Sequence, residues 1–165
     1  MIRGPEAEAA LARWLEIPTL VLGVGHPQRG DDALGPLVCA EAGVPHVVDC
    51  GDAPERFLGV AGDPAVSRVL FVDAMEFGGA PGEVAFCAAD ELREGAGTTH
   101  TTGLALLARY LQDSYGKPVA VLGVQPGNTA FGAEMDPAVQ ATAARVRAAL
   151  TRKASAQQEA AWTRS

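Results

Sequence analysis

The stretch VLGVGHPQRGDDALGP, residues 21–36, joins an apolar strand, a Gly-x-Gly turn and two adjacent carboxylates. A dinucleotide-binding fingerprint would continue with a third glycine at position 28, where this chain has Gln28. Asp31 and Asp32 would also lie against the pyrophosphate, at a helix N-terminus whose amides serve the anion. Asp49, at the end of the next apolar run, could still imitate the acid that binds the ribose. Nucleotide binding is therefore kept only as an alternative.

Apolar runs of the same kind recur along the chain and alternate with helical patterns. Four runs predict buried strands: residues 19–24, 44–51, 68–74 and 117–124. Three segments carry apolar residues at helical spacing: residues 33–43, 101–112 and 136–150. Strand alternating with helix predicts a three-layer α/β fold, in which a mostly parallel, twisted sheet carries helices on both faces.

One further strand is expected to run antiparallel. GEVAFC at residues 82–87 follows the run at 68–74 too closely for the crossover of about a dozen residues that parallel pairing needs. Around a single α/β domain at residues 18–151, we expect an amphipathic helix at 1–17 and a polar tail at 152–165 that frays.

Composition restricts the possible functions. Of the 165 residues, 48% are hydrophobic and 20% charged, the balance of a folded globular domain. The formal net charge of −7 argues against nucleic acid or an anionic membrane as partner, because both require clustered Lys and Arg. The sequence shows neither a membrane span nor a secretory signal. With three widely spaced cysteines and no Cys-x-x-Cys pair, the cytoplasm is the expected compartment.

The cysteines are weak candidates for chemistry. Cys39 falls on a predicted helix and Cys87 ends a strand, so both are expected in the core. Cys50 is expected in a strand-end loop where it could be exposed, but two neighbouring acids disfavour its thiolate.

Three acids and one histidine occupy positions where site residues are common. Asp31 and Asp32 open a predicted helix; Asp31 could cap it, whereas Asp32 has no obvious second capping role. Asp73 closes the run at 68–74 and is either a loop cap or a site residue. His100 begins a predicted helix, where it is either a surface residue or, kept neutral by the helix N-terminus, a metal ligand.

Topology predicts that three of these side chains converge. In open α/β sheets ligands bind outside the carboxyl ends of the strands, and Asp32, Asp73 and His100 all lie in or just after connections that leave those ends. Two carboxylates and one imidazole form an incomplete coordination sphere that can hold a divalent transition metal, and the imidazole argues against Mg²⁺ or Ca²⁺.

In their order and spacing these motifs resemble those of the maturation endopeptidases of nickel-iron hydrogenases. The resemblance covers residues 18–150. The matching motifs are Gly-x-Gly with the following pair of acids and a glycine at residues 23–35, DCGDAP at 49–54, Asp73 with Ala74, His100 with Gly103, and VLGVQP at 121–126.

The resemblance implies a fold, an activity and a site. The fold is phosphorylase/hydrolase-like, and the activity is removal of a C-terminal extension from the hydrogenase large-subunit precursor once nickel is in place. The metal-contacting acids and histidine of the family correspond here to Asp32, Asp73 and His100. The nickel belongs to the substrate, so the protein is expected to hold no metal tightly by itself.

Two residues depart from the family pattern. His26 stands where the family usually has Asn, and we expect it to lie beside Asp32 as an extra ligand. Cys50 replaces the first glycine of the family's Asp-Gly-Gly loop and could alter which precursor is accepted. Neither change removes a metal-contacting residue.

The sequence leaves the chemical step open. A divalent ion could polarise the scissile carbonyl or activate a bound water, whereas Asp31 or Asp32 could act as general base. Two other functions are also compatible with the sequence: a metallohydrolase with its own zinc, and a non-enzymatic adaptor that binds the metallated precursor.

Overall fold

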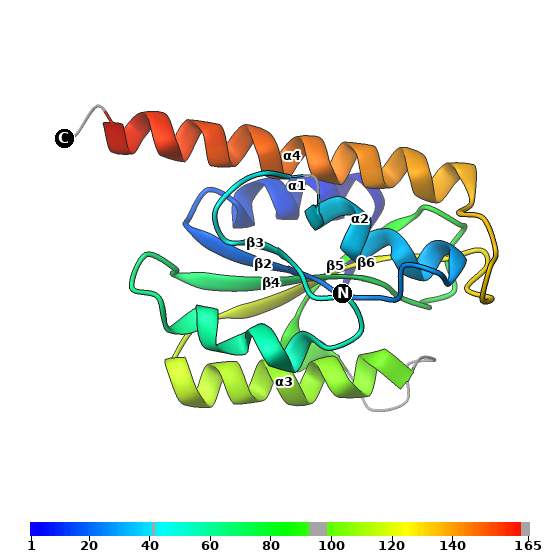
Figure 1. Ribbon diagram of the computed structural model, residues 1–165, viewed down its shortest axis with the longest axis horizontal. Helices are drawn as coiled ribbons and strands as arrows, with labels where there is room; N and C mark the ends of the chain where they lie inside the picture. Colours follow the sequence, from blue (N-terminus) through cyan, green and yellow to red (C-terminus); the bar gives the residue numbers. More distant parts are fainter. Residues whose placement is uncertain (41, 93–98, 163–165) are drawn as a thin grey trace.

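The computed structural model is built on one six-stranded sheet (Figure 1). It describes residues 1–40, 42–92 and 99–162, with the side chains at 99–102, 154–155, 157–158 and 160–162 outside that description. Across the sheet the strands follow the order β1 (Ile2–Arg3), β5 (Val84–Ala88), β6 (Val119–Val124), β4 (Arg68–Ala74), β2 (Thr19–Gly23) and β3 (Val47–Asp49).

The pairing of the strands confirms the predicted sheet. β6, β4, β2 and β3 are parallel, and β4 lies at the centre between β2 and β6. The strand expected to be antiparallel is β5, which pairs in that sense with β6. β1 pairs antiparallel with β5 and was not predicted, because two residues are too few to show a period.

Helices cover both faces of the sheet, as predicted. α1 (Gly4–Trp14), α2 (Leu34–Ala40) and α4 (Pro137–Trp162) lie on one face, and α3 (Thr99–Tyr115) and the 3₁₀ helix η2 (Pro54–Gly62) lie on the other (Figure 1). Two shorter 3₁₀ turns are η1 (Gly30–Ala33), directly before α2, and η3 (Ala89–Glu91), directly after β5. η2 was not predicted, because a short segment with few buried apolar residues shows no sustained period.

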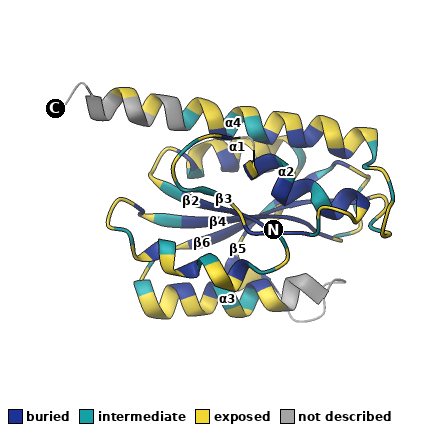
Figure 2. Cartoon of the chain, in the orientation of Figure 1, coloured by how far each residue is buried: buried dark blue, intermediate teal, exposed yellow. Residues whose placement is uncertain are grey.

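The sheet divides the core in two, because successive side chains of a strand point to opposite faces (Figure 2). On β4, Val69 and Phe71 pack toward α3 and η2, where Leu111 is fully buried. Leu70 and Val72 belong to the other cluster, with side chains from α1, α2 and α4. Both faces of β4 are therefore apolar, which explains its continuous apolar sequence.

The two ends of the chain are helical. α1 buries Ala7 and Leu11, and its Trp14 ring meets the Phe86 ring edge-on at 5.7 Å between centroids. α4 continues through Trp162 and so extends into the segment expected to be a polar tail, since residues 138–162 contain neither Gly nor Pro. Within the part of the chain that is described, no helix is both long and apolar enough to cross a membrane.

Candidate active site

Asp32 and Asp73 lie at the carboxyl ends of the central parallel strands. Asp73 is the penultimate residue of β4, and Asp32 lies in η1, which follows the end of β2. Both side chains are buried, with 1% of Asp73 and 5% of Asp32 exposed. Two acids that the sequence separates by forty residues are thus brought to one edge of the sheet, as the topology predicted.

The electrostatics of Asp73 are those of an acid without a counter-charge. Burial raises the pKa of the Asp73 carboxyl well above its ordinary value, and the negative charge of Asp32 raises it further, against a smaller lowering by the Ala74 amide. Its Oδ1 is buried and has no hydrogen-bond partner among the described residues. A buried, unpartnered carboxyl oxygen beside a second acid is costly unless a cation or proton is shared between them.

Backbone contacts hold Asp32 in place. Its Oδ2 accepts a hydrogen bond from the amide of His26 at 2.8 Å, and its own amide donates to the Arg29 carbonyl at 3.0 Å. Gly25 has a φ of +142°, and a Cβ at this position would overlap the backbone oxygen of Asp32. Gly25 therefore allows η1 to approach the end of β2 closely, and it serves this packing where a nucleotide site would use the glycine for a phosphate.

The carboxylate of Asp31 binds backbone amides of the loop between β6 and α4, which is distant in sequence. Its Oδ2 accepts hydrogen bonds from the amides of Gly127 at 2.7 Å and Asn128 at 2.8 Å, and its Oδ1 accepts from the amide of Asp136 at 2.7 Å. The expectation that Asp31 caps its own helix is wrong, because η1 has no side-chain cap and these donors lie about a hundred residues away. Asp31 is fully buried and fixes the loop that precedes α4.

His26 lies beside Asp32 through its backbone, while its ring is turned to the neighbouring loop. The ring Nδ1 accepts a hydrogen bond from the Gln28 amide at 3.1 Å, which leaves Nε2 to carry the proton in the neutral ring. The ring also lies 6.1 Å from that of Phe131, between centroids.

His100 is the second residue of α3, and its side chain lies outside the described part of the chain. Its position relative to Asp32 and Asp73 therefore stays a prediction. Among the side chains that are described, no three from His, Cys, Asp and Glu are grouped so that they could hold a metal ion.

Gln125, directly after β6, is a buried residue at this edge that sequence reasoning did not single out. Its Oε1 accepts hydrogen bonds from the amides of Phe77 and Gly79, at 2.9 and 3.0 Å, and its Nε2 donates to Glu76 Oε2 at 2.6 Å. Gln125 thus shapes the loop that follows Asp73. A polar residue directly after an apolar run, as in VLGVQP, is the signal that could have identified it.

The thiols offer no nucleophile. Burial, followed by the charges of Asp49 and Glu55, raises the pKa of Cys50 to about 12. The expectation that Cys50 could be exposed is wrong, since only 5% of the residue is accessible. Cys39 and Cys87 are buried as predicted, and their pKa values are also raised, mainly by desolvation.

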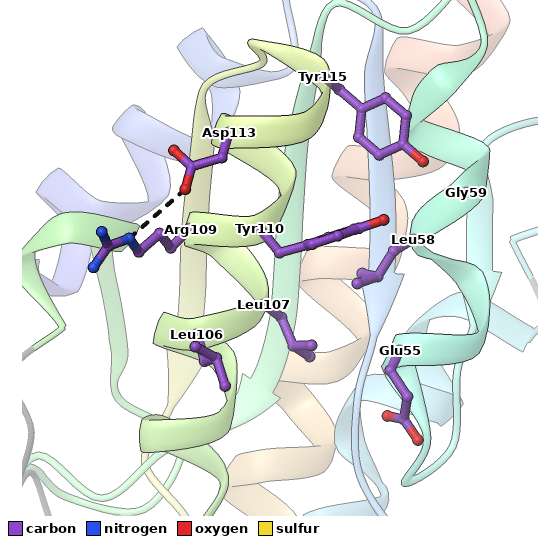
Figure 3. A pocket seen from close by; sticks show the side chains of 9 residues that line it. All are labelled: Glu55, Leu58, Gly59, Leu106, Leu107, Arg109, Tyr110, Asp113 and Tyr115. Carbon is purple, nitrogen blue, oxygen red and sulfur yellow. Dashed lines mark ion pairs between the residues drawn. The ribbon is translucent and has the colours of Figure 1, made fainter.

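A separate groove lies between α3 and η2 (Figure 3). It has a volume of about 630 Å³, and an Arg109–Asp113 ion pair of 3.7 Å lies on its rim. The groove is lined by Glu55, Leu58, Gly59, Leu106, Leu107, Arg109, Tyr110, Asp113 and Tyr115. Asp31, Asp32, Asp73 and His26 are not among the residues that line it.

The fold and the paired acids define the class of protein: an α/β protein with two buried carboxyl groups at the carboxyl edge of a parallel sheet, near enough for the charge of Asp32 to act on Asp73. Comparison with known proteins identifies the family. The family model for hydrogenase maturation proteases (HycI) matches residues 39–153, so the chain belongs to the hydrogenase maturation protease family. The protein is accordingly a peptidase, a hydrolase with hydrogenase maturation endopeptidase activity.

Individual relatives agree with this assignment. The hydrogenase 3 maturation protease of Escherichia coli strain K12 is 36% identical over 118 residues, which span 68% of this chain and 75% of the relative. The crystal structure of a [NiFe] hydrogenase maturation protease HycI from Thermococcus kodakarensis superposes with a TM-score of 0.75 at 28% identity, covering 84% of this chain and 92% of that one. The solution structure of the endopeptidase HycI from Escherichia coli gives 0.69 at 31% identity, covering 82% and 90%.

Proposed function

We propose that this endopeptidase removes a C-terminal extension from the large-subunit precursor of a nickel-iron hydrogenase after nickel has been inserted. Asp32, Asp73 and His100 would contact the nickel that the precursor carries. The observation that carries the proposal is the buried pair of Asp32 and Asp73, in which Asp73 Oδ1 lacks a described partner and the second acid disfavours ionisation.

A cation carried by the precursor would change the charge state of this pair. With no cation near, burial and Asp32 favour the protonated form of Asp73, as its raised pKa shows. A divalent ion beside both carboxyl groups opposes these effects, favours ionisation and turns the acids into ligands. Metal-free precursor brings no such charge, so the energetic cost of the acid pair discriminates between the two forms of the substrate.

Nickel is treated as part of the substrate because the donor set is weak. Two carboxylates and one imidazole are too few and too hard to retain nickel in competition with nitrogen- and sulfur-rich sites. His26 is a poor additional metal ligand, because its Nδ1 already accepts a hydrogen bond from the Gln28 amide. Ligands of the precursor complete the coordination, which places the scissile amide close to the acids.

Hydrolysis adds water across this amide and produces a carboxylate and an amine. The metal can supply charge stabilisation or a more acidic water, and Asp32 is the acid available as general base. Asp31 is better suited to positioning, because both of its oxygens accept short hydrogen bonds from backbone amides. We also infer that the reaction takes place in the cytoplasm, a compartment that suits three buried free cysteines.

The test compares precursor with and without nickel. Purified protein is incubated with each form, and the mass of the precursor is measured over time. We expect shortening of the nickel-loaded form only, and loss of that shortening in Asp73→Asn and Asp32→Asn. Equal cleavage of metal-free precursor, or full activity in both variants, would show the mechanism to be wrong. Submicromolar binding of Ni²⁺ by the protein alone would favour a hydrolase with its own metal.

A further inference from the structure

We propose that Phe131 is a contact residue for the precursor, which receives an apolar side chain near the cleaved bond. The inference rests on the proposed function, because it takes the edge occupied by Asp32 and Asp73 as the place of cleavage. Phe131 is 72% exposed, on the loop between β6 and α4. Single exposed apolar side chains are common on protein surfaces, so exposure alone carries no weight.

The first distinguishing feature of Phe131 is that hydrogen bonds hold the backbone of its loop in place. The amide of Gly132, the next residue, donates to the Gln28 carbonyl at 2.7 Å. Two residues before Phe131, the Thr129 carbonyl accepts the Arg29 Nε at 3.2 Å. The ring is therefore presented on a backbone fixed on both sides, which reduces the entropy lost when a partner binds.

Asp31 anchors the base of the same loop. Its carboxylate accepts the amides of Gly127, Asn128 and Asp136, and its amide donates to the Asn128 carbonyl at 2.9 Å. A fully buried acid adjacent to Asp32 in sequence thus fixes the segment that carries Phe131. This arrangement couples the position of the aromatic ring to that of the candidate site.

The second distinguishing feature is position. The Phe131 ring lies 6.1 Å from the His26 ring, and the His26 amide donates to Asp32 Oδ2 at 2.8 Å. One side chain therefore separates the exposed ring from an acid of the candidate site. A precursor segment that places its scissile bond at Asp32 therefore has the His26 and Phe131 rings close by.

The chemistry of the surface defines the partner. Rigid aromatic side chains gain affinity by burying apolar area, and they are frequent among the residues that dominate interfaces. The expected occupant is thus an uncharged apolar side chain of the precursor, in an extended segment beside the cleaved bond.

The test separates binding from chemistry. Cleavage of nickel-loaded precursor is followed in the full-length protein for Phe131→Ala, Phe131→Leu and the matched control Leu106→Ala, which alters a residue 70% exposed on α3. For Phe131→Ala we expect KM to rise by about 10- to 50-fold, with kcat within about twofold of wild type. Phe131→Leu should recover much of the loss, and Leu106→Ala should leave both constants unchanged.

A binding assay keeps this inference distinct from the proposed function. Affinity for intact precursor is measured in the Asp73→Asn background, with and without Phe131→Ala. If wild-type protein does not shorten the precursor, or Asp73→Asn cleaves normally, the proposed function is wrong while the binding assay still tests Phe131. Unchanged affinity in Phe131→Ala, or an equal loss in Leu106→Ala, would overturn the inference. So would a wild-type dimer that Phe131→Ala converts to a monomer by light scattering, since the ring would then contact a second copy.

Discussion

Replacing Asp31 by alanine should destabilise the protein strongly, although the residue lies on no helix of regular length and packs in neither apolar cluster. Its carboxylate accepts three backbone amides at 2.7, 2.8 and 2.7 Å, and the residue is fully buried. A hydrogen bond to a charged group contributes about 1.5–3 kcal/mol, and a donor left unsatisfied by burial costs about 1–3 kcal/mol. Water can reach part of the loop once the carboxylate is gone, so we expect a net loss of about 3–5 kcal/mol for the three bonds together.

Urea unfolding measures this loss. A matched control is Asp49→Ala, which removes an exposed carboxylate whose hydrogen bond, among the described residues, comes from the Gly51 amide at 2.9 Å. We expect about 0.5 kcal/mol or less for the control, because its donor is returned to solvent. Asp31→Asn should fall between the two, since an amide nitrogen must then face a backbone donor. A loss below about 1 kcal/mol in Asp31→Ala would refute the view that this carboxylate holds the loop.

Three further predictions concern the same edge of the sheet. Because the pKa of Asp73 is raised in the folded protein, the folded state loses stability as pH rises from the ordinary carboxyl pKa through the raised one. In calorimetry, Asp73→Asn should therefore have a higher melting temperature than wild type near neutral pH. The difference in melting temperature should disappear toward pH 4. Identical pH profiles would contradict this. Gly25→Ala should cost at least about 2 kcal/mol in urea unfolding, because φ is +142° and the new Cβ meets the Asp32 backbone oxygen. The Cys50 thiol, with a pKa of about 12, should react with an aromatic disulfide reagent at pH 7.5 only after denaturant is added; rapid labelling of native protein would show that it is accessible.

The mostly parallel sheet and the placement of the acids could be inferred from sequence because both follow from periodic patterns. Apolar runs alternating with helical segments define a parallel sheet, and an acid after such a run must lie at its carboxyl edge, as Asp73 does. The short gap before β5 likewise limited that strand to antiparallel pairing.

Other features depend on contacts that no local pattern encodes. β1 and η2 are too short or too sparsely apolar to show a period. Cys50 is buried because its loop packs against the core. The two acids beside it in the sequence indicate an exposed loop instead. The partners of Asp31 come from residues 127–136, and nothing in the sequence around Asp31 distinguishes this bridge from an ordinary helix cap.

The bridge made by Asp31 has a consequence for the order of events during synthesis. A ribosome adds about 5–20 residues per second, so Asp31 is made on the order of 5–20 s before the amides that it will accept. Until they arrive, burying this carboxylate would leave it without partners, which opposes closure of the loop around Asp32. The candidate active site is therefore completed late, after β2 and β4 have already been synthesised.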